Sequence, residues 1–129
     1  MTGISINKYI CSILKNNTNL LNYVVSNNIV SLYINPTEFP FISIMRNSIT
    51  PRYVKEGLQE DNVLVQIDII SDDYENSITI AEIVRDILEN RQFINNDGTH
   101  IDNITLSNIS ESYLDNSYVQ TLEFNITIH

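Results

Sequence analysis

The order of hydrophobic and polar positions near the start of the chain is that of a short amphipathic helix. Its apolar residues recur at the three- and four-residue spacing of one helical face, and they are Ile6, Tyr9, Ile10, Ile13 and Leu14. Ser5 is a suitable N-cap, and the polar run at residues 16–19 ends the helix because Asn and Thr favour turns. We expect a brief helical or irregular turn to follow at residues 20–25.

The clearest pattern lies in the middle of the chain, where a strand leads into a second helix. Residues 63–70 alternate with the two-residue period of a β-strand. Asp72, three residues before Glu75, has the spacing of a capping box at the start of a helix. The apolar stripe of this helix consists of Ile80, Ile83, Val84, Ile87 and Leu88. The other side is charged, and Arg85 can pair weakly with Glu89 one turn later. A single apolar stripe implies one buried face, so we expect this helix to lie on a sheet.

Four further segments have the composition of strands. Their β-branched and aromatic content predicts strands at residues 29–34, 41–45, 101–109 and 118–128. The last of these alternates most sharply, with Leu122, Phe124 and Ile126 on one face. Pro36 and Pro40 place a connection between the first two, because proline cannot donate to a strand ladder.

A polar segment at residues 47–62 separates two of the predicted strands. It contains Pro51 and Gly57 and most of the charged residues in this half of the chain. The pattern predicts a long hairpin connection or two strand ends with a mobile tip. Connections of this length in small domains are either functional or plain surface loops. A second, tighter turn is expected at Asp97-Gly98, where the dipeptide supplies positive φ angles.

The predicted elements follow the order α-β-β-β-α-β-β. Strands joined mainly by hairpins, with two amphipathic helices among them, are typical of the α+β class. We therefore expect one domain spanning residues 1–129, a mainly antiparallel β-sheet with the two helices packed on one face. A length of 129 residues fits one domain and leaves little for a second.

The amino-acid composition changes this picture little, but the distribution of charge adds to it. The excess of Ile and Asn is typical of an AT-rich genome. The net charge of −9 is divided unevenly: residues 1–64 carry five basic and four acidic side chains, net +1, and residues 65–129 carry two and twelve, net −10. So acidic a chain is unsuited to binding nucleic acid, which requires a basic patch, but an acidic surface lets DNA pass without adhering. Solvation of the surface is the simpler role for these carboxylates.

The start of the chain has no signal-peptide pattern, and no apolar run approaches the length of a membrane helix. Cys11 is the single cysteine, which suits a reducing compartment. We expect a protein made in the cytoplasm and not associated with a membrane.

A search for reactive residues finds no catalytic pattern. The three glycines are far apart and form no phosphate-binding loop. His100 and Asp102 share a face of a predicted strand, but no third metal ligand is near them in sequence. The acidic residues 68–75 lack the glycine that a calcium loop requires and suit helix capping better. Cys11 is better suited to packing than to nucleophilic attack. We expect no catalytic residue, cofactor or metal, and no enzymatic activity.

Three collinear patterns carry a resemblance to a known family. The first is the Pro-aromatic step Phe39-Pro40-Phe41-Ile42 after the first helix and strand. The second is Val65-Gln66-Ile67-Asp68-Ile69, followed by Asp73-Tyr74 and the helix with Ala81, Ile83 and Ile87. The third is Tyr113 and Tyr118 leading into Leu122-Glu123-Phe124-Asn125-Ile126. In this order the chain resembles the tail-completion proteins of bacteriophages, also called tail terminators or tail-to-head joining proteins. It has less Ala and Gly than that family usually has in its helices.

The resemblance implies a structural role in the virion. Such proteins form a ring, typically hexameric, between the tail tube and the head or neck proteins, and DNA passes through the lumen without specific binding. A ring requires a head-to-tail contact whose rotation closes, which an exposed sheet edge or hairpin can supply. Within the polar segment 47–62 we predict a subunit or tube contact at Arg52, Tyr53 and Lys55. The protein would be assembled in the host cytoplasm and located in the tail or neck.

Two alternatives remain open at the level of sequence. One is another ring of the head–tail neck, an adaptor or a stopper, with twelvefold instead of sixfold symmetry. The other is a small cytosolic protein-binding domain unrelated to phage. The sequence determines neither the ring symmetry nor the face that lines the channel.

Overall fold

The chain forms one α+β domain, seen here in a computed structural model that describes residues 3–32, 38–53, 57, 59–94 and 98–129. The helical elements are η1 (Gly3–Ser5), α1 (Ile6–Lys15), α2 (Thr18–Leu21), η2 (Ser26–Asn28) and α3 (Tyr74–Leu88). The strands are β1 (Ile29–Ser31), β2 (Phe41–Tyr53), β3 (Gln59–Ser71), β4 (Phe93–Ile94), β5 (His100–Leu114) and β6 (Ser117–Ile128). The α+β fold class and the predicted element order are confirmed, with α2 and β4 as short additions.

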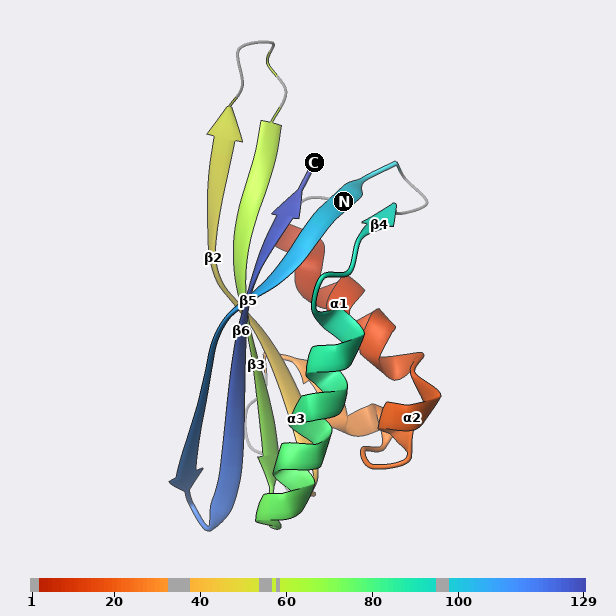
Figure 1. Ribbon diagram of the computed structural model, residues 1–129, viewed down its shortest axis with the longest axis vertical. Coiled ribbons are helices and arrows are strands. Elements are labelled where there is room, and N and C mark those ends of the chain that lie inside the picture. Colours follow the sequence, from red (N-terminus) through yellow and green to blue (C-terminus); the bar gives the residue numbers. More distant parts are fainter. Residues whose placement is uncertain (1–2, 33–37, 54–56, 58, 95–97) are drawn as a thin grey trace.

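All the strands belong to a single sheet in the order β1-β2-β3-β6-β5-β4. β1 runs parallel to β2, and every other neighbouring pair is antiparallel. The central pair is β3 and β6, which are distant in sequence and pair from Asp61 to Ser71 of β3, with Val65 opposite Phe124 and Ile67 opposite Leu122. The β2–β3 and β5–β6 hairpins flank this pair, and Figure 1 shows them extending from the body in opposite directions.

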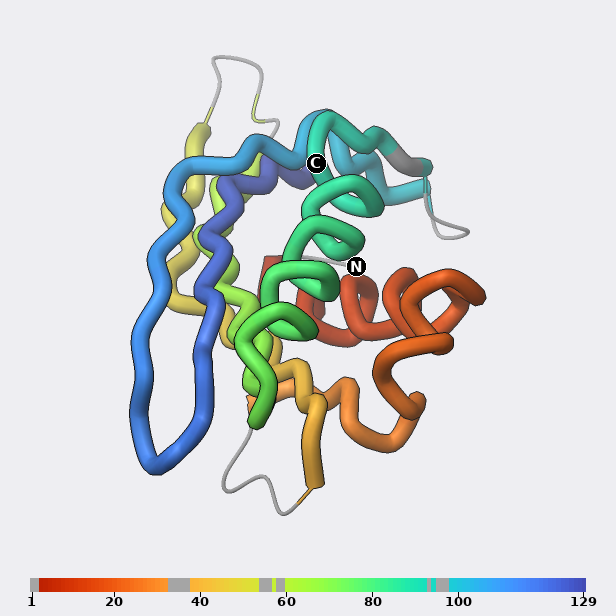
Figure 2. The backbone as a smooth tube through the Cα atoms, turned by 60° about the horizontal axis from the view of Figure 1, so that its bottom comes forward, coloured from red at the N-terminus to blue at the C-terminus, as the bar shows by residue number. Residues whose placement is uncertain are grey.

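The helices cover one face of the sheet and leave the other uncovered (Figures 1 and 2). α3 packs on β3 and β6, and α1 packs on β1 and β2. One apolar core fills the space between the layers. Its buried residues on the two long central strands are Val63, Val65, Ile67, Ile69, Leu122, Phe124, Ile126 and Ile128. The helices contribute Ile6, Ile10, Leu14, Leu20, Ile80, Val84, Ile87 and Leu88. The alternating and helical spacings in the sequence therefore identified this core correctly.

Two strands are longer than their apolar content predicts. β2 continues beyond Met45 to Tyr53, and β5 continues beyond Ile109 to Leu114. Residues 48–53 pair with residues 59–64 of β3, so most of the polar segment 47–62 consists of two strand ends and not of a loop. Pro51 is tolerated there because β1 pairs only with residues 42–44, which leaves this part of β2 at the sheet edge.

The turn between β5 and β6 explains the second extension. Asp115 and Asn116 both have positive φ angles, of 52° and 63°, as a two-residue type I′ hairpin turn requires. This tight turn brings Leu114 opposite Ser117 and continues the ladder to the end of the hairpin. Sequence reasoning did not identify this turn because it lacks the glycine that usually marks such turns.

The first predicted strand and one predicted cap require correction. β1 ends at Ser31, and Leu32 has a φ of +54°, which interrupts extended backbone; the rest of the predicted strand 29–34 lies outside the described residues. α3 begins after Asp73, so Asp72 is not its N-cap, and the Asp73 side chain makes no capping hydrogen bond. The Ser71 hydroxyl instead accepts a hydrogen bond from the Asp73 backbone amide at 3.1 Å.

The predicted pairing of Arg85 with Glu89 and the predicted end of the first helix are both confirmed. Arg85 Nε donates to Glu89 Oε2 at 2.7 Å. This hydrogen bond lowers the pKa of Glu89 and raises that of Arg85. α1 ends at Lys15, and the Asn17 side chain then accepts a hydrogen bond from the Leu20 amide at 3.0 Å and caps α2. No helix in the described part of the chain is both long and apolar enough to span a membrane.

Core packing between the two layers predicts that two Ile→Ala substitutions lower the free energy of unfolding by very different amounts. Ile67→Ala removes a side chain with no solvent exposure and should lower the free energy of unfolding by about 2–5 kcal/mol. Ile94→Ala truncates a side chain that is 71% exposed at the sheet margin and should change it by less than about 0.5 kcal/mol. Urea denaturation of both variants measures the difference, and equal losses would contradict this account of the core.

Candidate functional surface: the uncovered sheet face and its hairpins

The residues predicted to contact a neighbour lie at the far end of the β2–β3 hairpin. The Arg52 side chain is 64% exposed, and Tyr53 is 76% exposed. Arg52 Nη1 lies 3.7 Å from Glu60 Oε2 on the adjacent strand. Lys55, the third predicted contact residue, lies outside the described residues. The hairpin end thus presents an aromatic ring and a cation to solvent, beyond the part of the sheet that the helices cover (Figure 1).

The uncovered face of the sheet is polar and extensively hydrogen-bonded. Thr121 donates from Oγ1 to Asp68 Oδ1 at 2.7 Å, across the β3–β6 pair. Gln66 donates to both oxygens of Asp68 at 3.1 Å and accepts from the Asn47 amide at 3.1 Å. These bonds join β2, β3 and β6 in one network. Because the carboxylate of Asp68 has several donors, its negative charge is held in a fixed position on this face.

The acidic residues of the second half of the chain are divided between two opposite surfaces. The uncovered sheet face carries Asp68 and Glu123, and Glu60, from the first half of the chain, lies near the end of the β2–β3 hairpin. The solvent-facing side of α3 carries a second set, which comprises Glu75, Glu82, Asp86 and Glu89. The acidic run 68–75 therefore does not form one site, since Asp68 points away from the helix layer while Glu75 belongs to α3.

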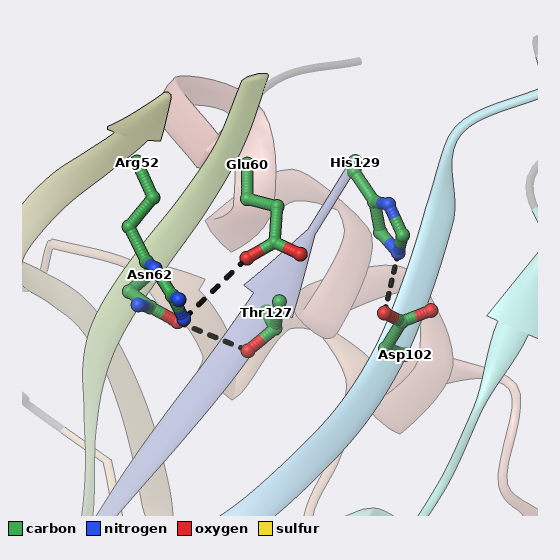
Figure 3. Close-up of polar contacts among 6 residues, drawn as sticks. All are labelled: Arg52, Glu60, Asn62, Asp102, Thr127 and His129. Carbon is green, nitrogen blue, oxygen red and sulfur yellow. Dashed lines mark hydrogen bonds and ion pairs between the residues drawn. The ribbon is translucent and has the colours of Figure 1, made fainter. Parts of the chain in front are cut away.

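A compact cluster of possible ligands lies where β3, β5 and the end of β6 meet. It consists of Glu60, Asp102 and His129, whose ligating atoms all lie within 4.8 Å of one another. His129 Nε2 contacts Asp102 Oδ2 directly (Figure 3). The backbone of His129 pairs in both directions with His100, at 2.6 and 2.9 Å. Of these three residues the sequence pattern pointed only to Asp102, which it paired with His100; Glu60 and His129 come from distant segments.

A second network fastens the start of α3 to the β5–β6 hairpin. The buried Gln120 amide donates to Ser77 Oγ at 3.3 Å and to Glu111 Oε2 at 3.0 Å. The Tyr74 hydroxyl donates to the same carboxylate oxygen at 3.0 Å. This hydrogen bond and the negative charge of Glu111 raise the pKa of Tyr74. Tyr118 packs edge-on against Tyr74, at a ring distance of 5.4 Å. The network is structural, because it joins helix to sheet through one carboxylate oxygen of Glu111.

Cys11 has the packing role that the sequence predicts. It is partly buried against the core, and its Sγ lies 3.5 Å from the Ile29 carbonyl oxygen. The described residues around it include no arrangement of base and nucleophile.

The sequence matches no family model and no curated protein. The fold, in contrast, is similar to that of a chain in a solved structure described as "Virion of native gene transfer agent (GTA) particle". The superposition has a TM-score of 0.76 and covers 92% of this chain and 90% of that chain, at 13% sequence identity. The two chains therefore share a fold over nearly their whole length.

The hydrogen-bonded network of the uncovered face can be tested with two substitutions of the same type. Thr121→Val keeps the shape of the side chain but removes a donor to a partly buried carboxylate, so it should lower the free energy of unfolding by about 1–2 kcal/mol. Thr105→Val removes a hydroxyl that is exposed on β5 and should change it by less than about 0.5 kcal/mol. Urea denaturation measures both values; a neutral Thr121→Val would show that Asp68 does not depend on this bond.

Proposed function

We propose that the chain is a structural protein of a bacteriophage-type virion that forms a ring, most simply a hexamer, between the tail tube and the head or neck proteins. The observation that carries the proposal is the similarity of fold, over nine-tenths of both chains, to a chain of a gene transfer agent virion. The collinear motifs that resemble tail-completion proteins support the same role. On this proposal the protein acts by assembly and not by catalysis, and it is located in the virion after assembly in the host cytoplasm.

The two open edges of the sheet suit a contact of the kind that closes a ring. At one edge, β1 covers only residues 42–44 of β2. At the other, β4 covers only residues 100–101 of β5, so beyond these residues the outer edge of β5, opposite β6, has no paired strand among the described residues. The two edges belong to the same sheet and lie at its opposite sides. A contact from the β2 edge of one subunit to the β5 edge of the next is head-to-tail, as a closed ring requires.

The charge distribution suits a channel through which DNA passes. A negative lumen repels phosphates and so prevents a passing duplex from adhering to the wall. The uncovered sheet face and the solvent side of α3 both offer such a surface. The far end of β2 lies away from α3 (Figure 1). Arg52 and Tyr53 are the last two residues of that strand, where they can contact a neighbouring subunit or the tube.

The oligomeric state of the purified chain tests the proposal directly. Six copies of the 14.8 kDa chain give a particle of 6 × 14.8, about 89 kDa, and twelve give about twice that mass. Light scattering after size exclusion, followed by negative-stain imaging, should show closed rings of one of these masses. A chain that stays strictly monomeric, both alone and with tail-tube protein, would contradict the proposal.

A matched pair of tyrosine variants tests the role of the β2–β3 hairpin. Exposed tyrosines at interfaces often contribute about 2 kcal/mol or more to binding, so Tyr53→Ala should weaken ring association by roughly 30-fold or more. Tyr23→Ala truncates an exposed tyrosine on the helix side and should leave the rings intact. Mass photometry over a dilution series measures both, with circular dichroism as the check that each variant is folded. Rings of unchanged stability in Tyr53→Ala would exclude this hairpin as the contact.

A further inference from the structure

We propose that Glu60, Asp102 and His129 form a binding site for a divalent transition-metal ion of the zinc type. The three residues come from β3, from β5 and from the position after β6, and their ligating atoms lie within 4.8 Å of one another. Three donors this close can reach a common ion with small side-chain movements, since ligand bonds to zinc are about 2.0–2.2 Å long. This inference rests on the cluster alone and is independent of the proposed ring.

The backbone holds each of these side chains in place. Asp102 lies at a register shift in the β5–β6 ladder, between Ile101 and Asn103, and such a bulge turns a side chain away from the regular alternation. His129 is fixed by its two backbone hydrogen bonds to His100. Glu60 belongs to the paired part of β3, opposite Arg52. The cluster is therefore built on three strands of one sheet.

The polar groups around the cluster also restrain it. Thr127 Oγ1 donates to Asn62 Oδ1 at 3.0 Å and links β6 to β3 two residues along each strand from the ligands (Figure 3). In Figure 3 the Glu60 carboxylate lies between the Arg52 guanidinium and the contact of Asp102 with His129. The Thr127–Asn62 bond thus braces the two strands next to Glu60 and His129 without contacting the ligands themselves.

The cluster gathers negative charge that a divalent cation would neutralise. Two carboxylates lie close together, and the His129 ring contacts one of them, that of Asp102. Arg52 is 3.7 Å from Glu60, longer than a normal hydrogen bond, and its side chain is mostly exposed. One M²⁺ ion would neutralise both carboxylates and accept a lone pair from the His129 ring.

The donor set determines the class of metal. An imidazole nitrogen with two carboxylate oxygens suits zinc and its first-row neighbours, whereas calcium and magnesium prefer oxygen ligands only. All three side chains are partly open to solvent, which leaves room for water in the remaining coordination position. A bound ion would link β3 to β5 across β6 at the end of the sheet where the β2–β3 hairpin begins to project.

Calorimetric titration of the whole chain with ZnCl₂ tests the proposal, after treatment with chelator and removal of any N-terminal affinity tag. The wild type should bind one Zn²⁺ per chain, and binding should raise its Tm. Glu60→Gln and His129→Ala should each weaken the affinity at least tenfold and abolish the rise in Tm. CaCl₂ and MgCl₂ should give no saturable binding at the same concentrations.

His100→Ala is the matched control, because His100 is an exposed histidine on the paired strand whose ring centroid is 5.9 Å from that of His129. It should retain the wild-type affinity for Zn²⁺. Absence of saturable Zn²⁺ binding by the folded wild type would overturn the proposal. So would an equal loss of affinity in His100→Ala and His129→Ala, or undiminished binding by Glu60→Gln.

Discussion

The structure depends on the strict alternation of side chains along the central β3–β6 pair. Every second residue of both strands points into the core, and these residues are apolar from Val63 to Ile69 and from Leu122 to Ile128. A shift of register by one residue would turn all of them to solvent, so burial of this face fixes the pairing. The helix layer, the polar uncovered face and the position of both hairpins follow from that register.

The same pair explains why the two hairpins project. α3 has 15 residues and is therefore about 22 Å long, because a helix rises 1.5 Å per residue. Strands of 12 to 15 residues extend for about 40–50 Å at 3.3 Å per residue. One helix cannot cover strands of that length, so the sheet continues beyond α3 on the side of the β2–β3 hairpin (Figure 1). The exposed apolar side chains Tyr53, on β2, and Tyr113 and Leu114, on β5, lie at the hairpin ends.

This difference between covered and overhanging parts also decides what the sequence could predict. Alternation and helical spacing record burial, so they identified the core strands, both main helices and the side of α3 that packs on the sheet. Residues 48–53 and 110–114 are paired but mostly unburied, and their polar sequences contain no periodic signal for a strand. The cluster of Glu60, Asp102 and His129 depends on the register of three strands and on a bulge at Asp102, neither of which a single sequence encodes in a local pattern.

The uncovered sheet face and the hairpin ends differ in how many of their groups are available to contact a partner. On the uncovered face, Asp68, Gln66 and Thr121 satisfy one another, so a partner would have to break existing hydrogen bonds to use them. At the hairpin ends, Tyr53 and Leu114 are largely exposed, and contact with these side chains displaces water. The acidic sheet face is therefore suited to remain exposed, while the projecting ends are suited to hold neighbouring molecules. Both properties follow from the unequal lengths of helix and strand in one small domain.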